Sequence, residues 1–272
     1  MSQAQSGTSQ VGGAPAGAPQ GSGPALAGRV ALVTGASSGI GRATALAVAE
    51  QGGAVAVTAR RADRLEELAG GIRARGGSVL VLPADLSDPA QVDAVVEHTV
   101  GHFGRLDVLV NNAAASAPGF VEHSDPARWD TLVEVNFRAV LRLSHTALPH
   151  LLRAADRPAG VADVVNISSV VGRKPIKGNA VYSAAKHAVI AFGDAFRQEV
   201  ALRKVRVGVV EPGMVATDMT VGTGVGDEAG HTMTERDWLH VDDVARAVVF
   251  MVTQPRRSAV SEILLRPTAQ EY

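Results

Sequence analysis

A phenol and an ammonium group four residues apart carry the clearest chemical signal in the chain. Tyr182 and Lys186 stand in a Tyr-Ser-Ala-Ala-Lys stretch. On a helix this spacing puts both groups on one face, roughly one turn apart. The phenol of a free tyrosine has a pKa of about 10, and a nearby ammonium lowers it by stabilising the phenolate. Such a tyrosine can donate a proton to a developing alkoxide or accept one from an alcohol.

A serine strengthens this signal, because a Tyr-x-x-x-Lys pattern alone is usually a surface coincidence. Ser169 comes thirteen residues before Tyr182, two residues after the predicted fifth strand ends at Ile167. A hydroxyl at the carboxyl end of a central strand can hydrogen-bond a substrate carbonyl. We interpret the neighbouring Ser168 as a cap of the strand end.

Three glycines follow the first apolar run of the chain and open a predicted helix. Gly35, Gly39 and Gly41 come directly after Val30–Thr34. Glycine lets the backbone turn tightly and approach a pyrophosphate, while the helix N-terminus offers free N–H groups and the positive end of its dipole. Tight strand–helix turns also collect glycine for structural reasons, but the strand–turn–helix context favours a dinucleotide site.

The residues after the second predicted strand bear on which dinucleotide binds. An acid there favours a free ribose 2′-hydroxyl, and a base favours a 2′-phosphate. The chain reads Thr-Ala-Arg-Arg over residues 58–61, without an acid. Arg60 can fork onto a phosphate, so we predict NADP(H) as the preferred cofactor, with NAD(H) possible. Arg61 is interpreted as a solvated arginine at the start of an exposed helix.

Polar residues at other strand ends have two interpretations each. Asp85 either contacts an adenine edge or caps the following turn. Asn111 and Asn112 close the fourth predicted strand, at the sheet edge where ligands bind, or satisfy strand-end backbone groups.

Apolar, β-branched runs alternate with amphipathic stretches along the chain. Strands are predicted at residues 30–34, 54–59, 79–83, 106–110, 161–167, 205–210 and 262–266, and the longest helices at 128–154 and 180–203. This alternation predicts an α/β fold, a single-domain doubly wound parallel sheet with helices on both faces. Residues 1–26 are nearly all Gly, Ala, Ser, Gln and Pro, which predicts a disordered tail before a catalytic domain at 27–272.

Composition excludes several classes of function. The 272 residues carry a net charge of −1 and no cysteine, so neither a nucleic-acid footprint nor thiolate chemistry is expected. No metal-ligand spacing, no apolar run of about 18 residues and no secretory signal is evident. We expect a cytoplasmic protein that binds a small molecule, without a membrane or nucleic-acid partner.

Through a set of motifs, the chain resembles the short-chain dehydrogenase/reductase family. It matches the family's Thr-Gly-x-x-x-Gly-x-Gly at 34–41, its Asn-Asn-Ala-Gly at 111–114, its helix asparagine at Asn136, its serine at Ser169, its Tyr-x-x-x-Lys at 182–186 and its Pro-Gly at 212–213. The resemblance runs from about residue 28 to the C-terminus. Ala114 departs from the family, which usually has glycine there.

The resemblance implies a role for each matching residue. Tyr182 is the general acid–base, Lys186 lowers its pKa and holds the nicotinamide ribose, Ser169 orients the carbonyl or alcohol, and Asn136 anchors a water that passes protons toward Lys186. Thr217 lies near the carboxamide. The implied cofactor contacts, with Tyr182 and Lys186, are Gly35, Ser37, Ser38, Gly39, Ile40, Gly41, Arg60, Asp85, Leu86, Asn112, Ala113, Pro212, Gly213, Val215 and Thr217. A seven-stranded Rossmann sheet and a dimer or tetramer are also implied.

The predicted function is hydride transfer between NADP(H) and a carbonyl or alcohol. The alternative is a catalytically inactive dinucleotide-binding sensor or scaffold, which should have lost one of the four catalytic residues. The glycine-rich stretch 214–238 predicts a mobile lid. Apolar stripes on the two long helices either face the sheet or pair with a second subunit; they contain Leu141, Leu148 and Leu152, and Val189, Phe192 and Phe196.

Overall fold

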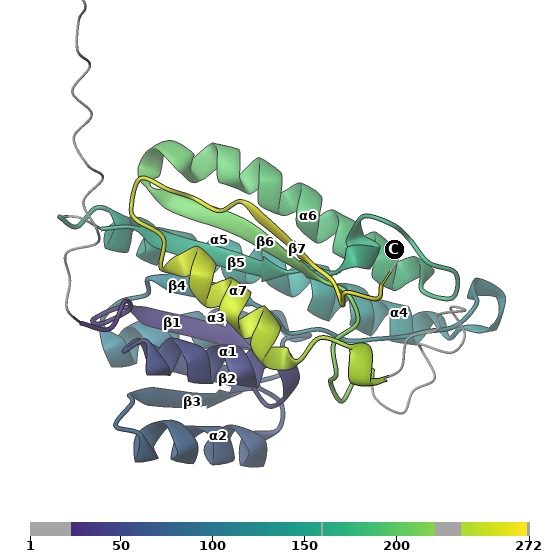
Figure 1. Ribbon diagram of the computed structural model, residues 1–272, viewed down its shortest axis with the longest axis horizontal. Helices are drawn as coiled ribbons and strands as arrows, with labels where there is room; N and C mark the ends of the chain where they lie inside the picture. The colour runs from purple at the N-terminus through teal and green to yellow at the C-terminus, as the bar shows by residue number, and fades with distance from the viewer. Residues whose placement is uncertain (1–22, 159, 221–234, 271–272) are drawn as a thin grey trace, which may run out of the picture.

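Seven parallel strands form one sheet at the centre of the molecule. The computed structural model describes residues 23–158, 160–220 and 235–270. The strand order is β3-β2-β1-β4-β5-β6-β7. The strands are β1 (Val30–Thr34), β2 (Ala54–Ala59), β3 (Val79–Pro83), β4 (Val108–Asn111), β5 (Ala162–Ile167), β6 (Val205–Pro212) and β7 (Glu262–Leu265). The doubly wound sheet predicted from the alternating apolar runs is confirmed (Figure 1).

Helices cover both faces of this sheet. One face packs against α1 (Gly39–Glu50), α2 (Ala62–Ala74) and α7 (Val241–Val252). The other packs against α3 (Pro89–Phe103), α5 (Ala139–Ala155) and α6 (Ala180–Val200) (Figure 1). Every residue of β1, β4, β5 and β6 is buried, which explains why these strands are mostly apolar and do not alternate between apolar and polar residues.

The helix predicted at 128–154 is not a single α-helix. It consists of α4 (Pro126–Val133), a π-helical turn at Glu134–Arg138, and α5. A π-turn inserts one extra residue into the hydrogen-bonding pattern and is frequent at functional sites. Asn136 is the buried residue of this turn. The apolar periodicity of this long stretch gave no sign of the extra residue.

The packed part of the chain begins before the predicted boundary at residue 27. Leu26 is fully buried in the core beside α1, and its N–H donates to the carbonyl of Gln51 at 2.9 Å. This contact was not predicted, because a single apolar side chain in a Gly/Ala/Pro-rich stretch gives no periodic signal. The rest of the predicted tail, residues 1–22, and most of the predicted lid, residues 221–234, lie outside the described residues.

A network of buried ion pairs occupies the amino-terminal edge of the sheet. Asp163 is contacted by the guanidinium groups of Arg29 and Arg206. Close by, the buried Asp107 accepts two hydrogen bonds from Arg105 and one from the backbone of Val30. These pairs fix the starts of β1, β4, β5 and β6, at the sheet edge opposite the residues with predicted chemistry.

Candidate active site

The carboxyl end of β5 and the first turns of α6 bring Ser169, Tyr182 and Lys186 to one edge of the sheet. Lys186 is 3% exposed, and its Nζ donates to the carbonyl of Ile167, the last residue of β5, at 2.9 Å. The same Nζ lies 5.6 Å from the centroid of the Tyr182 ring. Ser169 follows Ile167 by two residues. The end of β5 and the face of α6 that carries Lys186 therefore lie against one another.

Burial acts on both members of the Tyr–Lys pair. The Tyr182 ring packs in a small apolar cluster with Ala117, Leu132 and Trp129. Burial raises the pKa of Tyr182 to about 12 and lowers the pKa of Lys186 to about 8. The expected lowering of the Tyr182 pKa by Lys186 is not found, because desolvation disfavours both charged forms and the ammonium is directed at a backbone carbonyl.

Two adjacent serines make different contacts at the end of β5. The Ser169 hydroxyl donates to the carbonyl of Pro212 at 3.4 Å and accepts from the N–H of Val171 at 3.3 Å. Ser168 is buried, and its hydroxyl donates to the carbonyl of Lys186 at 2.9 Å. Ser168 therefore links the strand end to α6, which goes beyond the strand-end capping expected of it.

Asn136 joins the π-turn to the segment that follows β4. Its side chain is 1% exposed. The Oδ1 atom accepts from the N–H of Ala115 at 2.7 Å, and Nδ2 donates to the carbonyl of Ala115 at 3.0 Å. Both polar atoms of the amide are thus used by one backbone residue. Asn136 fixes the path of the chain next to Ala113 and Ala114.

The predicted glycine turn is built around close backbone contacts. Gly35 and Gly39 have φ angles of 65° and 53°, in the left-handed region that favours glycine. A Cβ atom on Gly41 would lie 2.4 Å from the carbonyl oxygen of Gly35. Asn112 Nδ2 donates to the carbonyl of Thr34 at 2.8 Å, which holds the end of β4 against this turn.

The first turn of α1 carries none of the features that usually neutralise a helix N-terminus. Ser38 is the N-cap residue, yet its hydroxyl makes no capping hydrogen bond, and the first turn contains no acidic residue. Unsatisfied N–H groups and the positive dipole end therefore remain at this edge of the sheet, beside Ile40 and Gly41. This arrangement suits an anion such as a phosphate.

Arg61, rather than Arg60, contacts the glycine turn. Its Nη2 atom donates to the hydroxyls of Ser37 at 3.1 Å and Ser38 at 2.7 Å, and its Nη1 atom lies 3.5 Å from the carboxylate of Asp218. Arg60 makes no hydrogen bond or ion pair with the part of the chain that the structure describes. The sequence interpretation of Arg61 as merely solvated missed this contact, for which the two serines of the turn were the available signal.

Asp85 and Leu86 serve local packing. The carboxylate of Asp85 accepts from the N–H of Ser87 at 3.0 Å and from its hydroxyl at 2.9 Å, which is the turn-capping alternative. The side chain of Leu86 is buried in the core between the sheet and α3. Ala113 packs against the same core from the end of β4.

The segment after β6 crosses the carboxyl edge toward α1. The N–H of Gly213 donates to the carbonyl of Leu265 at 2.7 Å, and Val215 is buried. The methyl carbon of Thr217 lies 3.3 Å from the position that a Cβ on Gly39 would take. A cavity of about 630 Å³ opens here, between α1, this segment and the start of α7. The predicted cofactor residues Gly39 and Thr217 both line it.

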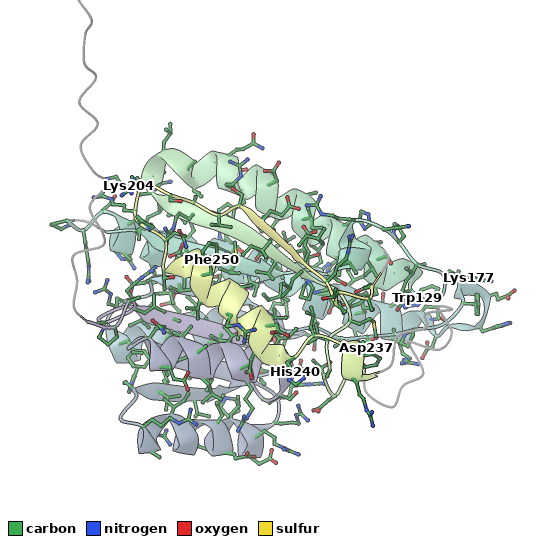
Figure 2. All side chains as sticks on the ribbon, viewed as in Figure 1. Trp129, Lys177, Lys204, Asp237, His240 and Phe250 are labelled. Carbon is green, nitrogen blue, oxygen red and sulfur yellow. The ribbon has the colours of Figure 1, made fainter. Side chains whose placement is uncertain are left out.

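The loops after β4 and β5 meet beside Tyr182. The N–H of Gly119 donates to the carbonyl of Gly178 at 2.8 Å, and the Lys177 ammonium lies 5.3 Å from the centroid of the Phe120 ring. Trp129 and Lys177 lie at the same end of the molecule (Figure 2). Phe120 remains 47% exposed. These loops give the end of the molecule near Tyr182 an apolar and a cationic side chain.

Two negative findings apply to the described residues. Within residues 23–158, 160–220 and 235–270, no three histidine or acidic side chains gather in a way that could hold a metal ion. In the same ranges, no helix combines the length and apolar character that crossing a bilayer requires.

Comparison with known proteins gives one consistent result. A family described as short chain dehydrogenase matches residues 29–227, and one described as NAD dependent epimerase/dehydratase matches residues 224–265. An uncharacterized oxidoreductase of Staphylococcus epidermidis is 35% identical over 239 residues, which cover 88% of this chain and 97% of the relative.

Solved structures agree with the sequence relatives. A short chain dehydrogenase from Burkholderia cenocepacia, in complex with NADP, matches with a TM-score of 0.81 and 32% identity over 90% of this chain and 98% of its own. An alcohol dehydrogenase from Thermococcus sibiricus, complexed with 5-hydroxy-NADP, matches with a TM-score of 0.78 and 28% identity, over 90% of this chain and 98% of its own.

Proposed function

The chain belongs to the short chain dehydrogenase family and is an oxidoreductase, and from this premise we propose that it transfers a hydride between NADP(H) and a carbonyl or alcohol substrate. The observation that carries the proposal is the hydrogen bond from Lys186 to Ile167, which holds the helix bearing Tyr182 against the strand end bearing Ser169. A proton donor, a hydroxyl and an ammonium therefore share one rigid corner of the sheet.

The residues at the neighbouring edge fit a dinucleotide. A Cβ on Gly41 would collide with the carbonyl of Gly35, so this tight strand–helix turn can form only with glycine at that position. The first turn of α1 has no acidic residue and no side-chain cap, which leaves its amides for a pyrophosphate. Gly39, Thr217 and Asn112 complete the edge that would hold the cofactor.

The chain's own residues would handle the proton. NADPH, when bound, supplies the hydride. Because burial raises the pKa of Tyr182 to about 12, its phenol is protonated at neutral pH and can donate to the oxygen of a carbonyl substrate. Ser169 would donate a hydrogen bond to the same oxygen and so orient it. Asn136 would hold the segment around Ala115 that faces the substrate.

The cofactor preference rests on two arginines. Arg61 is held at the glycine turn by Ser37 and Ser38, and Arg60 makes no contact with the described residues. No acid follows β2 to favour a free 2′-hydroxyl. Arginine recognises phosphate through paired N–H donors, so we assign the 2′-phosphate to Arg60 and Arg61 together. Relatives of known structure bound to NADP are consistent with this assignment.

We also propose a homo-oligomer in which α5 and α6 contact a second copy. Val189 and Phe196 are buried within the chain and serve its own core, whereas Leu141, Leu148 and Phe192 keep part of their surface exposed. A two-fold interface would cover these partly exposed side chains. Light scattering should give a dimer or tetramer mass, and a Leu148→Arg variant should reduce it. A monomer at micromolar concentration contradicts this proposal.

The reaction class can be tested directly. Purified full-length protein is incubated with NADPH or NADH and a panel of ketones and aldehydes, and absorbance of the reduced cofactor is followed. We expect oxidation of NADPH with at least one carbonyl. An inactive sensor or scaffold would bind NADPH, seen as a change in its fluorescence, and oxidise none of it with any member of the panel.

A further inference from the structure

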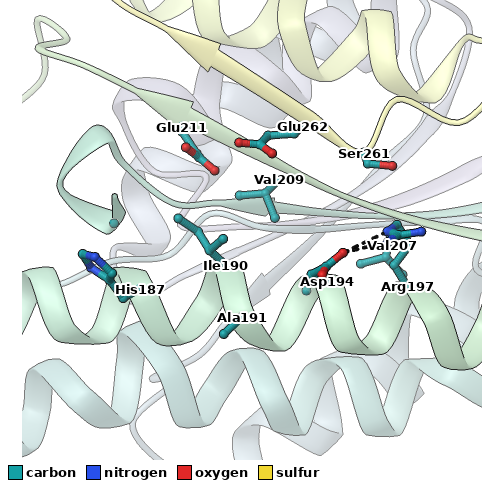
Figure 3. A pocket seen from close by; sticks show the side chains of 12 residues that line it. His187, Ile190, Ala191, Asp194, Arg197, Val207, Val209, Glu211, Ser261 and Glu262 are labelled. Carbon is teal, nitrogen blue, oxygen red and sulfur yellow. Dashed lines mark hydrogen bonds and ion pairs between the residues drawn. The ribbon is translucent and has the colours of Figure 1, made fainter. Parts of the chain in front are cut away.

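An ion pair between the half-exposed Arg173 and the buried Glu211 lies behind the turn that carries Ser169. Glu211 in β6 is fully buried, and its carboxylate accepts one hydrogen bond from Arg173 Nη2 at 3.0 Å and another from Arg173 Nε. Arg173 also contacts Glu262 of β7. Figure 3 shows Glu211 and Glu262 beside one another on neighbouring strands, in a cavity of about 470 Å³ between these strands and α6. The fork of one arginine thus joins a loop to two strands.

The pair connects the same two segments as the contact of Ser169 with Pro212. Arg173 closes the short 3₁₀ turn Val170–Gly172, four residues after Ser169, and Glu211 directly precedes Pro212. The β5–β6 pairing ends at Ile167 and Val210, followed by one bond from the N–H of Ser168. After Ser168, the described hydrogen bonds between the Ser169 turn and the end of β6 are made by the side chains of Ser169 and Arg173.

The turn is also packed closely against α6. A Cβ on Gly172 would lie 2.7 Å from the hydroxyl of Ser168 and 3.0 Å from the carbonyl of Lys186. The Ser168 hydroxyl donates to that same carbonyl. A shift of the turn would therefore change the position of Ser169 relative to both Lys186 and Pro212.

Stability alone gives little reason for a charged pair at this position. Burying the Glu211 carboxylate costs desolvation energy, and a partner that is 41% exposed returns only part of it, because solvent screens the attraction. A bidentate arginine–carboxylate pair instead fixes the relative geometry of the two segments that it joins. At the Ser169 turn this geometry matters, since displacement of a reacting group by about 1 Å can cost about a hundredfold in rate.

We propose that Arg173 is a positioning residue: through Glu211 it holds the Ser169 turn in register with Pro212 and Lys186, and thereby sets where the substrate oxygen is bound. This inference rests on the proposed carbonyl–alcohol chemistry. Neither side chain touches the substrate in this role. Its effect is transmitted through the backbone of Ser169–Arg173.

Three variants separate positioning from stability. Arg173→Met combined with Glu211→Met removes the pair without leaving a buried carboxylate unpaired. Arg173→Lys keeps the charge but loses the planar fork. Arg105→Met is the matched control, because Arg105 makes the same two-bond contact with the buried Asp107 at the opposite edge of the sheet.

Steady-state kinetics and amide hydrogen exchange provide the readouts. The double variant should lose about tenfold to a hundredfold in kcat while its KM for NADPH stays within about twofold. Arg173→Lys should recover part of kcat, and Arg105→Met should retain all of it even if its melting temperature falls. The amides of Val171 and Gly172 should exchange faster in the double variant and at the original rate in the control.

One outcome would overturn the inference and is distinguishable from failure of the proposed function. Unchanged kcat and unchanged exchange at Val171 and Gly172 in a folded double variant would overturn it. If the unmodified protein oxidises NADPH with no carbonyl, the proposed function fails instead. In that case the exchange measurement still decides whether the ion pair holds the turn.

Discussion

The ammonium of Lys186 donates to the carbonyl oxygen of Ile167 at 2.9 Å, which ties α6 to β5 two residues before Ser169. The bond from Ser168 to the carbonyl of Lys186 runs between the same two elements in the opposite direction. Together they hold α6, which carries Tyr182 and Lys186, against the end of β5, directly before the turn that carries Ser169. Sites built in this way hold their geometry more closely, as acid–base chemistry requires.

Tyr182→Phe should abolish most turnover while leaving NADPH binding intact. The substitution removes only the hydroxyl, and the ring can keep its packing against Trp129 and Ala117. Loss of a general acid typically costs about a hundredfold to ten-thousandfold in rate. Turnover is measured by NADPH absorbance, and binding by NADPH fluorescence. Near-normal turnover in this variant would rule out Tyr182 as the acid.

The two directions of the reaction should respond differently to pH. Reduction uses the protonated phenol, which predominates far above neutral pH because burial raises the pKa of Tyr182 to about 12. Oxidation uses the phenolate, whose fraction rises about tenfold per pH unit below that pKa. Initial rates between about pH 6 and 9 should therefore rise with pH for alcohol oxidation and not for carbonyl reduction. An oxidation rate that falls with pH would contradict this assignment.

Much of the fold follows from the sequence because the central strands are buried on both faces. Continuous β-branched runs located all seven strands, several of them within a residue of their bounds. The π-turn at Glu134–Arg138 was missed, because one inserted residue barely changes apolar periodicity. Asn136 was selected through family resemblance, and its bonds to Ala115 give the structural reason for its burial.

The chemistry of the site is less visible from the sequence. The spacing of Tyr182 and Lys186 suggested a lowered phenol pKa, but the pKa depends on packing by residues such as Trp129 that lie far away in the sequence. The pairing of Arg173 with Glu211 depends on sheet register and on the path of a turn. Residue type does not tell which of two adjacent arginines reaches the glycine turn, so the contact of Arg61 with Ser37 and Ser38 was not predicted.

Arg60→Ala and Arg61→Ala should each weaken NADPH binding more than NADH binding. A lost charged hydrogen bond costs about 1.5–3 kcal/mol, or roughly tenfold to a hundredfold in affinity. Arg64→Ala is the control, since Arg64 lies in the first turn of α2, directly after these two arginines, and pairs only loosely with Glu67, at 3.9 Å. Fluorescence titration gives the dissociation constants. Equal affinity of the unmodified protein for NADPH and NADH would remove the basis for this assignment.

Leu26→Ala should destabilise the domain, although Leu26 lies in a segment with a tail-like composition. Its side chain is fully buried in the core beside α1. Truncating a buried leucine typically costs about 2–5 kcal/mol, through lost apolar contacts and the cavity left behind. Leu202→Ala is the control, because Leu202 is 97% exposed. Urea unfolding should show a clear loss for the first variant alone; similar stability of the two would mean that Leu26 is not part of the core.

Lys186 should make the stability of the domain depend on pH above neutrality. Burial lowers its pKa from 10.5 to about 8 in the folded chain, so between these values the unfolded chain binds more protons. The penalty for burying the ammonium is present in full below about pH 8 and disappears as the lysine loses its proton. The free energy of unfolding of the unmodified protein, relative to Lys186→Met, should therefore rise between about pH 8 and 10. Lys177→Met, at an exposed lysine, is the control for the change from lysine to methionine. If the free energy of unfolding relative to Lys186→Met instead stays constant or falls between about pH 8 and 10, Lys186 keeps its proton in the folded chain.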